Sequence, residues 1–199
     1  MTCSGTRPSG RETPAGEGQR HVSIAAGTAT HTAMVEADGS AAFDDLVSLL
    51  DYPMFIVTTA SDGHPAGCLV GFTSQTSINP PRFLVGLSRK NHTFGIAQSA
   101  EHLAVHVLPR HELPLARLFG GTTGDTSDKF AQCEWHTGPQ GMPILDAAPA
   151  WFVGRVLRRF DVGDHVGHLV EPVAGAAPDT LGELISFSDV RDVSPGHNA

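Results

Sequence analysis

Short apolar segments separated by turn-forming residues run from residue 54 onward, and this pattern constrains the fold most strongly. Residues 54–59 and 66–72 flank Asp62-Gly63, a dipeptide typical of tight β-hairpins because glycine accepts a positive φ. Further strands are predicted at 82–87, 103–108, 150–157 and 165–170, and short helices at 43–50, 93–99 and 113–119. Hairpin-joined strands with few helices predict a mainly β domain, a barrel or a sandwich.

The two ends of the chain differ in composition from this middle part. Residues 1–40 are rich in Gly, Ser, Thr, Ala and Pro and lack apolar periodicity, which predicts a disordered extension. An arm that packs on a partner subunit is the alternative. We place one domain at 41–175 and a loop-like tail at 176–199, with a weak strand at 184–187.

Charge and cysteine content narrow the classes of partner and compartment. Thirteen basic and 21 acidic residues give a net charge of −8, which argues against nucleic-acid or anionic-membrane partners. Cys3, Cys68 and Cys133 form neither a disulfide framework nor a paired metal motif, as expected in a reducing cytoplasm. The sequence has no run of transmembrane length and no signal-peptide core, so we expect a cytoplasmic protein.

Several enzyme motifs are missing from the sequence. There is no GxGxxG after a strand, no GxxxxGK[ST] and no GxSxG. His102 and His106 share one face of a predicted strand, but no third ligand is evident, so no metal site is expected.

A polar segment at 71–81 lies between two predicted strands, and we interpret it as a loop. Its hydroxyl and amide side chains would suit a phosphate or the polar edge of a planar heterocycle; they are Thr73, Ser74, Gln75, Thr76 and Ser77. Composition alone favours an ordinary turn.

A basic segment follows the strand at 82–87 and begins a predicted helix. Its candidate phosphate ligands are Ser88, Lys90, Asn91, His92 and Thr93. Helix N-termini and cationic side chains both attract anions. A solvated loop in which Asn or Thr caps the helix is an equally good interpretation.

Two later segments contain further candidates. Asp128 and Lys129 lie at the end of a glycine-rich loop at 120–128. This loop would either cover a flat cofactor or be an ordinary surface loop. Asp164 and His165 occupy a turn between strands, where a histidine can face a cofactor or donate a proton. A surface or structural histidine is the commoner case.

Taken in order, these motifs resemble the flavin reductase-like family, over about 51–172. The resemblance rests on Cys68-Leu-Val-Gly-Phe72, on the hydroxyl-rich segment ending at Pro80-Pro81, on Asp128-Lys129-Phe130, on Gly141-Met-Pro-Ile-Leu145 and on Gly163-Asp164-His165. The first of these runs looks closest to the actinobacterial branch. Gly71-Phe72 and Gln75 replace the Asn-Ser and Ser of many members, and the usual Gly-Arg-aromatic end is missing, with 187–192 in its place.

The resemblance implies a six-stranded antiparallel, Greek-key-type FMN-binding split β-barrel that forms a homodimer. It also implies hydride transfer from NADH or NADPH to FMN, or to FAD, with reduced flavin supplied to a monooxygenase partner. The phosphate is expected at Ser88, Lys90, His92 and Thr93, the ring at 73–77, and a nicotinamide-positioning or proton-relay role at His165 and Asp164. A non-catalytic flavin- or haem-binding protein, and a flavin- or deazaflavin-dependent oxidoreductase of another small molecule, are the alternatives.

Overall fold

The computed structural model describes residues 38–196. It divides into two compact units after Asp44. The helix predicted at 43–50 is present as α1 (Gly39–Leu49), which starts four residues earlier and crosses this boundary, and none of its residues is buried. The expected disorder of 1–40 falls, up to residue 37, outside the described residues.

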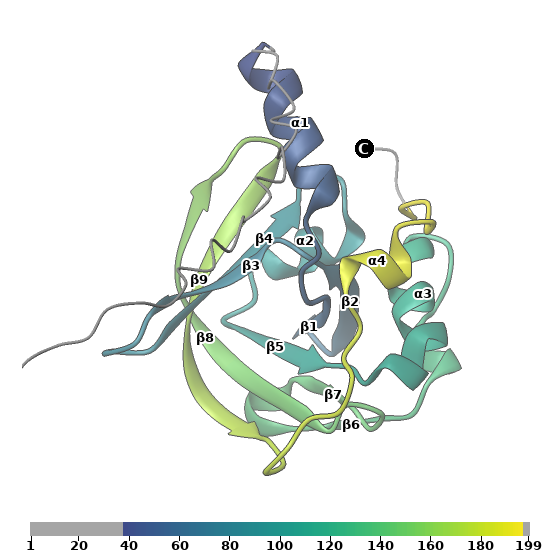
Figure 1. The fold of residues 1–199 in the computed structure, drawn as a ribbon. Helices are drawn as coiled ribbons and strands as arrows, with labels where there is room; N and C mark the ends of the chain where they lie inside the picture. Colours follow the sequence, from purple (N-terminus) through teal and green to yellow (C-terminus); the bar gives the residue numbers. More distant parts are fainter. Residues whose placement is uncertain (1–37, 197–199) are drawn as a thin grey trace, which may run out of the picture. The chain divides into compact units, whose positions relative to one another are not determined.

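The second unit is built on an antiparallel sheet of seven strands in the order β2-β1-β5-β8-β9-β4-β3 (Figure 1). The strands are β1 (Phe55–Ser61), β2 (His64–Val70), β3 (Thr73–Ser77), β4 (Arg82–Ser88), β5 (His102–Val107), β8 (Ala150–Asp161) and β9 (His165–Ala176). The mainly β prediction is confirmed, but the sheet has one strand more than the six expected. The strands β6 (Trp135–Thr137) and β7 (Pro143–Leu145) form a separate small sheet.

The extra strand is β3, which lies in the polar segment predicted to be a loop; that prediction is wrong for residues 73–77. The segment pairs only with β4, and its three middle residues are exposed. An edge strand needs no apolar face on its solvent side, and threonine fits a pleated backbone well, so a polar sequence is compatible with it.

The hairpin between β1 and β2 forms where Asp62-Gly63 predicts it. Ser61 faces His64 in the register, and the two turn residues have φ values of 50° and 78°. Both are positive, as a two-residue type I′ turn requires. The middle of β1 is buried, so this hairpin supplies part of the core.

The hairpin of β8 and β9 is longer than predicted. Its ladder runs from Asp161 opposite Val166 to Trp151 opposite Ala176, with two register shifts. The loop expected after Pro172 therefore begins only after Ala176. A β-bulge leaves residues unpaired and bends the strand, so a long hairpin of this kind shows no simple alternation in its sequence.

The helices of this unit are short: α2 (His92–Ala97), α3 (Leu113–Gly121) and α4 (Phe187–Val190), with 3₁₀ turns at Arg110–Glu112, Phe130–Gln132 and Pro139–Gly141. Gly120 and Gly121, expected in a loop, end α3 instead. The weak strand predicted at 184–187 is reduced to isolated bridges at Leu184 and Ser186, because Ser186 then begins α4 with a capping box.

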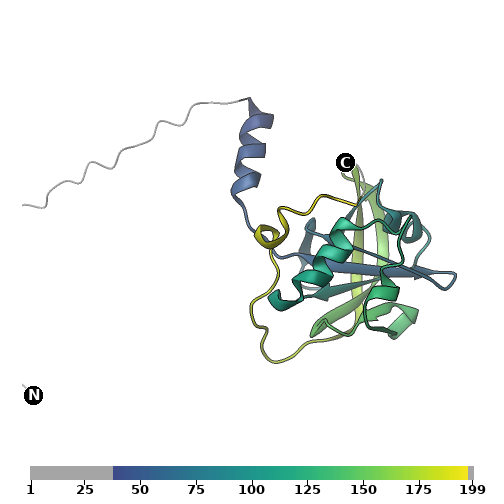
Figure 2. The same ribbon diagram turned by 90° about the vertical axis from the view of Figure 1, so that its right-hand side faces the viewer.

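The C-terminal segment returns to the sheet and packs beside α3, as both views show (Figures 1 and 2). Ile185 and Val190 are buried in one apolar cluster with Phe119 of α3 and Ile56 of β1. The tail is thus part of the core. Within residues 38–196, no helix combines the length and apolar character needed to cross a membrane.

Candidate functional site

A cavity of about 410 Å³ lies between the end of β2 and the second half of β4, two segments that are not paired with each other in the sheet. The strand β3 pairs with β4 only as far as Val85, so Gly86 to Ser88 have no strand partner on that side. The amide of Gly86 donates instead to the carbonyl oxygen of Phe72, at 2.7 Å. Because backbone groups alternate in direction along a strand, the amide of Ser88 faces the same opening.

The residues around this cavity come from five parts of the chain. They are Met54 and 68–72 from the first hairpin and its end, 86–91 from β4 and the following turn, Phe119 and Gly120 from α3, Asp164 and His165, and Phe187, Val190, Val193 and Pro195 from the tail. The structure therefore brings Ser88, Lys90 and Asn91 together with Asp164 and His165, as expected from the sequence.

The basic segment forms a tight turn at the cavity before α2. Asn91 caps this helix, since its side-chain oxygen accepts from the amide of Thr93 at 2.9 Å. Arg89 pairs with Asp161, whereas Lys90 is exposed at the cavity. Asn91 thus has the structural role of a cap, and Lys90 remains the cation best placed for an anionic ligand.

His165 and Asp164 form a hydrogen-bonded pair on the cavity wall. Nδ1 of His165 lies 2.7 Å from a carboxylate oxygen of Asp164, and this bond and the charge of His165 lower the pKa of Asp164. The imidazole stands edge-on to the ring of Phe72, with 4.8 Å between centroids. His165 also lies opposite Ser88 in the register of β4 and β9, so the sheet fixes its position beside the polar turn.

Other predicted residues line a second cavity, of about 510 Å³, between the first hairpin, α2 and the loop at 124–130. His92 lies here, with Nδ1 2.8 Å from a carboxylate oxygen of Asp125. Lys129 also lines it but is only 5% exposed; its Nζ donates to the carbonyl of Thr122 at 3.1 Å, and burial lowers its pKa. Asp128 accepts from the amide of Phe130, which begins a 3₁₀ turn.

The remaining candidates line neither of these two cavities. Thr73 to Ser77 form the edge strand β3, where the side-chain amide of Gln75 donates to the backbone carbonyl of Ser77. Thr93 is 1% exposed, and its hydroxyl has no hydrogen-bond partner in the described part of the chain. His106, considered above for metal, is fully buried and bonded to backbone groups on both ring nitrogens.

Sequence reasoning missed the apolar part of the first cavity. Phe187, Val190 and Val193 come from a segment that was interpreted mainly as loop. Their spacing of three residues was the available signal, since it places apolar side chains on one side of a helical turn.

The comparisons with known proteins agree on one family. Residues 47–192 match the family described as "Flavin reductase like domain". The stachydrine N-demethylase reductase subunit Stc3 of Rhizobium meliloti (strain 1021) is 33% identical over 55% of this chain and 47% of its own, so the chain spans about half of that relative. FMN reductase (NADH) RutF of Klebsiella pneumoniae is 30% identical over 66% of this chain and 79% of its own.

A solved structure shows the same fold. NADH:FAD oxidoreductase SgcE6 of Streptomyces globisporus C-1027 superposes with a TM-score of 0.69 at 21% identity, over 79% of this chain and 93% of its own. The family match covers the sheet, the second cavity, the tail as far as residue 192, and the lining of the first cavity apart from Val193 and Pro195. This chain belongs to the flavin reductase-like family.

Proposed function

We propose that this protein is a flavin reductase that uses NADH or NADPH to reduce FMN or FAD. The main support is the cavity between the end of β2 and the second half of β4, which combines a polar turn with an apolar wall. Relatives named FMN reductase (NADH) and a fold neighbour named NADH:FAD oxidoreductase agree with this proposal.

The residues present fit an isoalloxazine nucleotide. The ring is flat and has one polar and one apolar end, and the cavity is lined by Ser88 and Asn91 as well as by Leu69 and Phe187. The volume of about 410 Å³ falls within the range of roughly 300–1,000 Å³ that is usual for small-molecule sites. Lys90 at the mouth offers an ammonium group to a phosphate.

A flavin bound here would accept a hydride from the nicotinamide and would supply the redox chemistry itself. The chain contributes binding and orientation. We propose that Ser88, Lys90, Asn91, His92 and Thr93 form the phosphate side of the site, with Asp128 and Lys129 supporting it from the second cavity. We further propose that Thr73 to Ser77 stiffen the hairpin of β3 and β4 next to the cavity and contact the flavin.

His165 and Asp164 would position the nicotinamide or hold a proton. The carboxylate of Asp164 fixes the orientation of the imidazole through Nδ1, which leaves Nε2 for a ligand. Both residues line the cavity, so their side chains could contact a nicotinamide bound there.

The finer features expected from the family are part of the same proposal. We propose that the domain at 41–175 closes as a split barrel with 176–199 as its tail, that the protein is a cytoplasmic homodimer, and that it belongs to the actinobacterial branch. Apolar side chains of this unit that remain exposed, including Phe72 at 59% and Ile78 at 85%, support a partner subunit. The name of a fold neighbour, nitrilotriacetate monooxygenase component B from Mycobacterium thermoresistibile, supports a monooxygenase partner that takes the reduced flavin.

The test is oxidation of NADH and NADPH, followed by absorbance, with FMN or FAD in excess. Turnover supports a reductase, whereas tight flavin binding without turnover would indicate a binding protein and would overturn the proposal. A resident flavin that passes electrons to a quinone or nitro compound, with no reduction of added flavin, would indicate another oxidoreductase.

The role of His165 needs a matched control, which the chain provides in His136. His136 pairs with Asp146 at 2.6 Å but lines neither of the two cavities. We expect His165→Ala to lower kcat/KM for the nicotinamide about 100-fold or more, since acid–base groups typically contribute about 10²–10⁴-fold. His136→Ala should leave it unchanged. Equal behaviour of the two variants would remove His165 from the mechanism.

A further inference from the structure

The tail segment 185–195, here called the C-terminal strap, supplies a purely apolar part of the cavity lining. Its four lining residues are Phe187, Val190, Val193 and Pro195. The hydrogen-bonding and charged lining residues come from 88–91 and from 164–165. The two parts of the lining therefore differ in the chemistry that they offer to a ring.

The strap is held firmly by its own core residues. Ile185 is 1% exposed and Val190 is 5% exposed, and both pack in the cluster that contains Phe119. Val193 lies against α3, where a Cβ at Gly121 would come within 3.3 Å of one of its methyl groups. A side chain at Gly121 would therefore crowd Val193.

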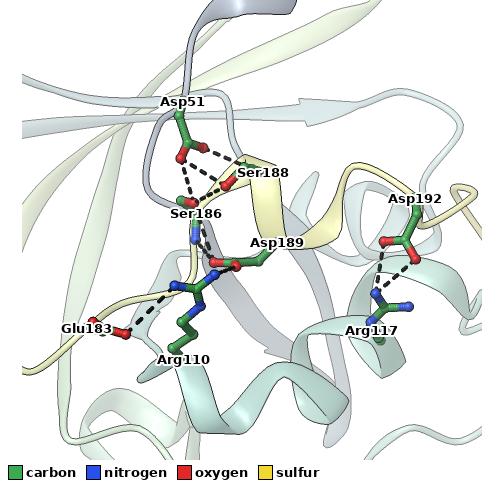
Figure 3. Close-up of polar contacts among 8 residues, drawn as sticks. All are labelled: Asp51, Arg110, Arg117, Glu183, Ser186, Ser188, Asp189 and Asp192. Carbon is green, nitrogen blue, oxygen red and sulfur yellow. Dashed lines mark hydrogen bonds and ion pairs between the residues drawn. The ribbon is translucent and has the colours of Figure 1, made fainter.

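A polar clasp fixes the strap on its outer side (Figure 3). Asp51 accepts from the amide of Ser188 at 2.9 Å and from the hydroxyl of Ser186 at 2.8 Å. Arg110 pairs with Asp189 at 2.6 Å, and Arg117 donates to both carboxylate oxygens of Asp192 at 2.9 Å.

Phe187 is held in place by contacts with Tyr52 and Arg191. Its ring is stacked on Tyr52 with 4.9 Å between centroids and 9° between planes, and its amide donates to the carbonyl of Tyr52 at 2.9 Å. The guanidinium of Arg191 lies 5.3 Å from the centroid of the same ring. Any movement of Phe187 within the cavity would break these contacts.

We propose that the C-terminal strap is the specificity-determining wall of the flavin site, and that Phe187 limits the size of substituents on the apolar edge of the isoalloxazine ring. This inference rests on the proposed function. Burying the polar pyrimidine end against the strap would leave its hydrogen-bonding groups without partners, which is unfavourable. The dimethylbenzene edge can be buried there without that loss, so this edge faces Phe187.

The experiment compares three ligands by isothermal titration calorimetry, which gives Kd without turnover. They are FMN, an FMN analogue with an 8-dimethylamino group on the apolar edge, and N3-methyl FMN, altered at the polar end. The wild-type protein should bind the 8-substituted analogue about tenfold more weakly than FMN, a discrimination usual for a small group in a tight pocket.

The Phe187→Ala protein should bind FMN and the 8-substituted analogue about equally, while the penalty for N3-methyl FMN persists. Phe187→Leu keeps an apolar side chain at this position and should give an intermediate ratio, so the test stands if the alanine variant is unstable. Val173→Ala, an exposed position of β9 that lines neither cavity, is the control and should match the wild type.

An unchanged preference in both Phe187 variants, in a protein that binds and reduces FMN, would overturn this inference alone. A selective loss of the N3-methyl penalty would place the polar end against the strap and would also overturn it. If the wild-type protein binds no flavin, the proposed function itself fails.

Discussion

His106 lies directly opposite Ile56 in the register of β1 and β5, and its Nδ1 lies 3.0 Å from the Ile56 carbonyl oxygen. The other ring nitrogen, Nε2, accepts from the amide of Leu145 at 3.3 Å. These two bonds require a neutral imidazole with its proton on Nδ1. The residue is fully buried, and burial lowers its pKa from 6.5 to about 4.

The stability of the protein should therefore fall as the pH drops from about 6.5 towards 4. In this window the unfolded chain takes up a proton on His106 while the folded chain does not, so acid favours unfolding. The slope for one such group approaches about 1.4 kcal/mol per pH unit. Above about pH 6.5 the contribution of neutral His106 to the free energy of unfolding is fully present.

Urea unfolding between pH 4.5 and 7.5 measures this effect. His106→Gln should flatten the profile in part, and a residual slope is expected because burial also lowers the pKa of His168. Free energies of unfolding that stay constant across the window would contradict the assignment of His106 as a neutral, buried hydrogen-bonding group.

Gly71 lies against Tyr52, whose ring is stacked on that of Phe187. A Cβ at this position would lie 2.6 Å from Cε2 of Tyr52 and 2.9 Å from the sulfur of Met54. We expect Gly71→Ala to displace Tyr52, to lower the free energy of unfolding by about 1–3 kcal/mol as overpacked sites do, and to weaken flavin binding.

The matched control is Gly95→Ala in α2, where a Cβ would have nothing within 4 Å. Alanine favours the helix by about 0.5–1 kcal/mol over glycine, so this variant should be slightly more stable. Its Kd for FMN should equal that of the wild type. Wild-type stability and affinity in Gly71→Ala would show that Tyr52 and Met54 can give way.

The strap should depend on its apolar anchors far more than on its clasp. We expect Ile185→Ala to cost about 2–5 kcal/mol, as large-to-small changes in a packed core do. Asp192→Asn should cost under about 1 kcal/mol, since its ion pair with Arg117 is about half exposed. Denaturant unfolding of both variants, at low and high salt, checks this order; the reverse order would make the clasp the main restraint.

Sequence patterns predicted the parts of the fold that local chemistry determines. The Asp62-Gly63 turn, the strands at 54–59 and 82–87 and the helix begun by Asn91 follow from turn preferences, apolar runs and capping. The edge strand β3 was missed because its partner β4, rather than its own composition, makes it a strand. Tertiary pairing of this kind leaves little trace in a polar sequence.

The candidate site was predicted only in part, because it too depends on pairing and packing between distant segments. Ser88 and His165 meet because β4 and β9 are paired. The family resemblance had assigned Ser88 to the phosphate and His165 to the nicotinamide, and these roles stay predictions. The division into two cavities and the contribution of Phe187 depend on how the tail packs against α3 and Tyr52. Such contacts join residues more than 60 positions apart, which no local pattern encodes.

Cys68 lines the first cavity, yet we expect its thiol to be unreactive. The residue is 2% exposed, and burial raises its pKa to about 11. Because the thiolate is the reactive form, the folded protein at pH 8 should resist alkylation at Cys68 by iodoacetamide, whereas the partly exposed Cys133 should react sooner. Peptide mass mapping, before and after denaturation, measures both. Alkylation of Cys68 as fast as Cys133 would mean that the cavity wall opens in solution.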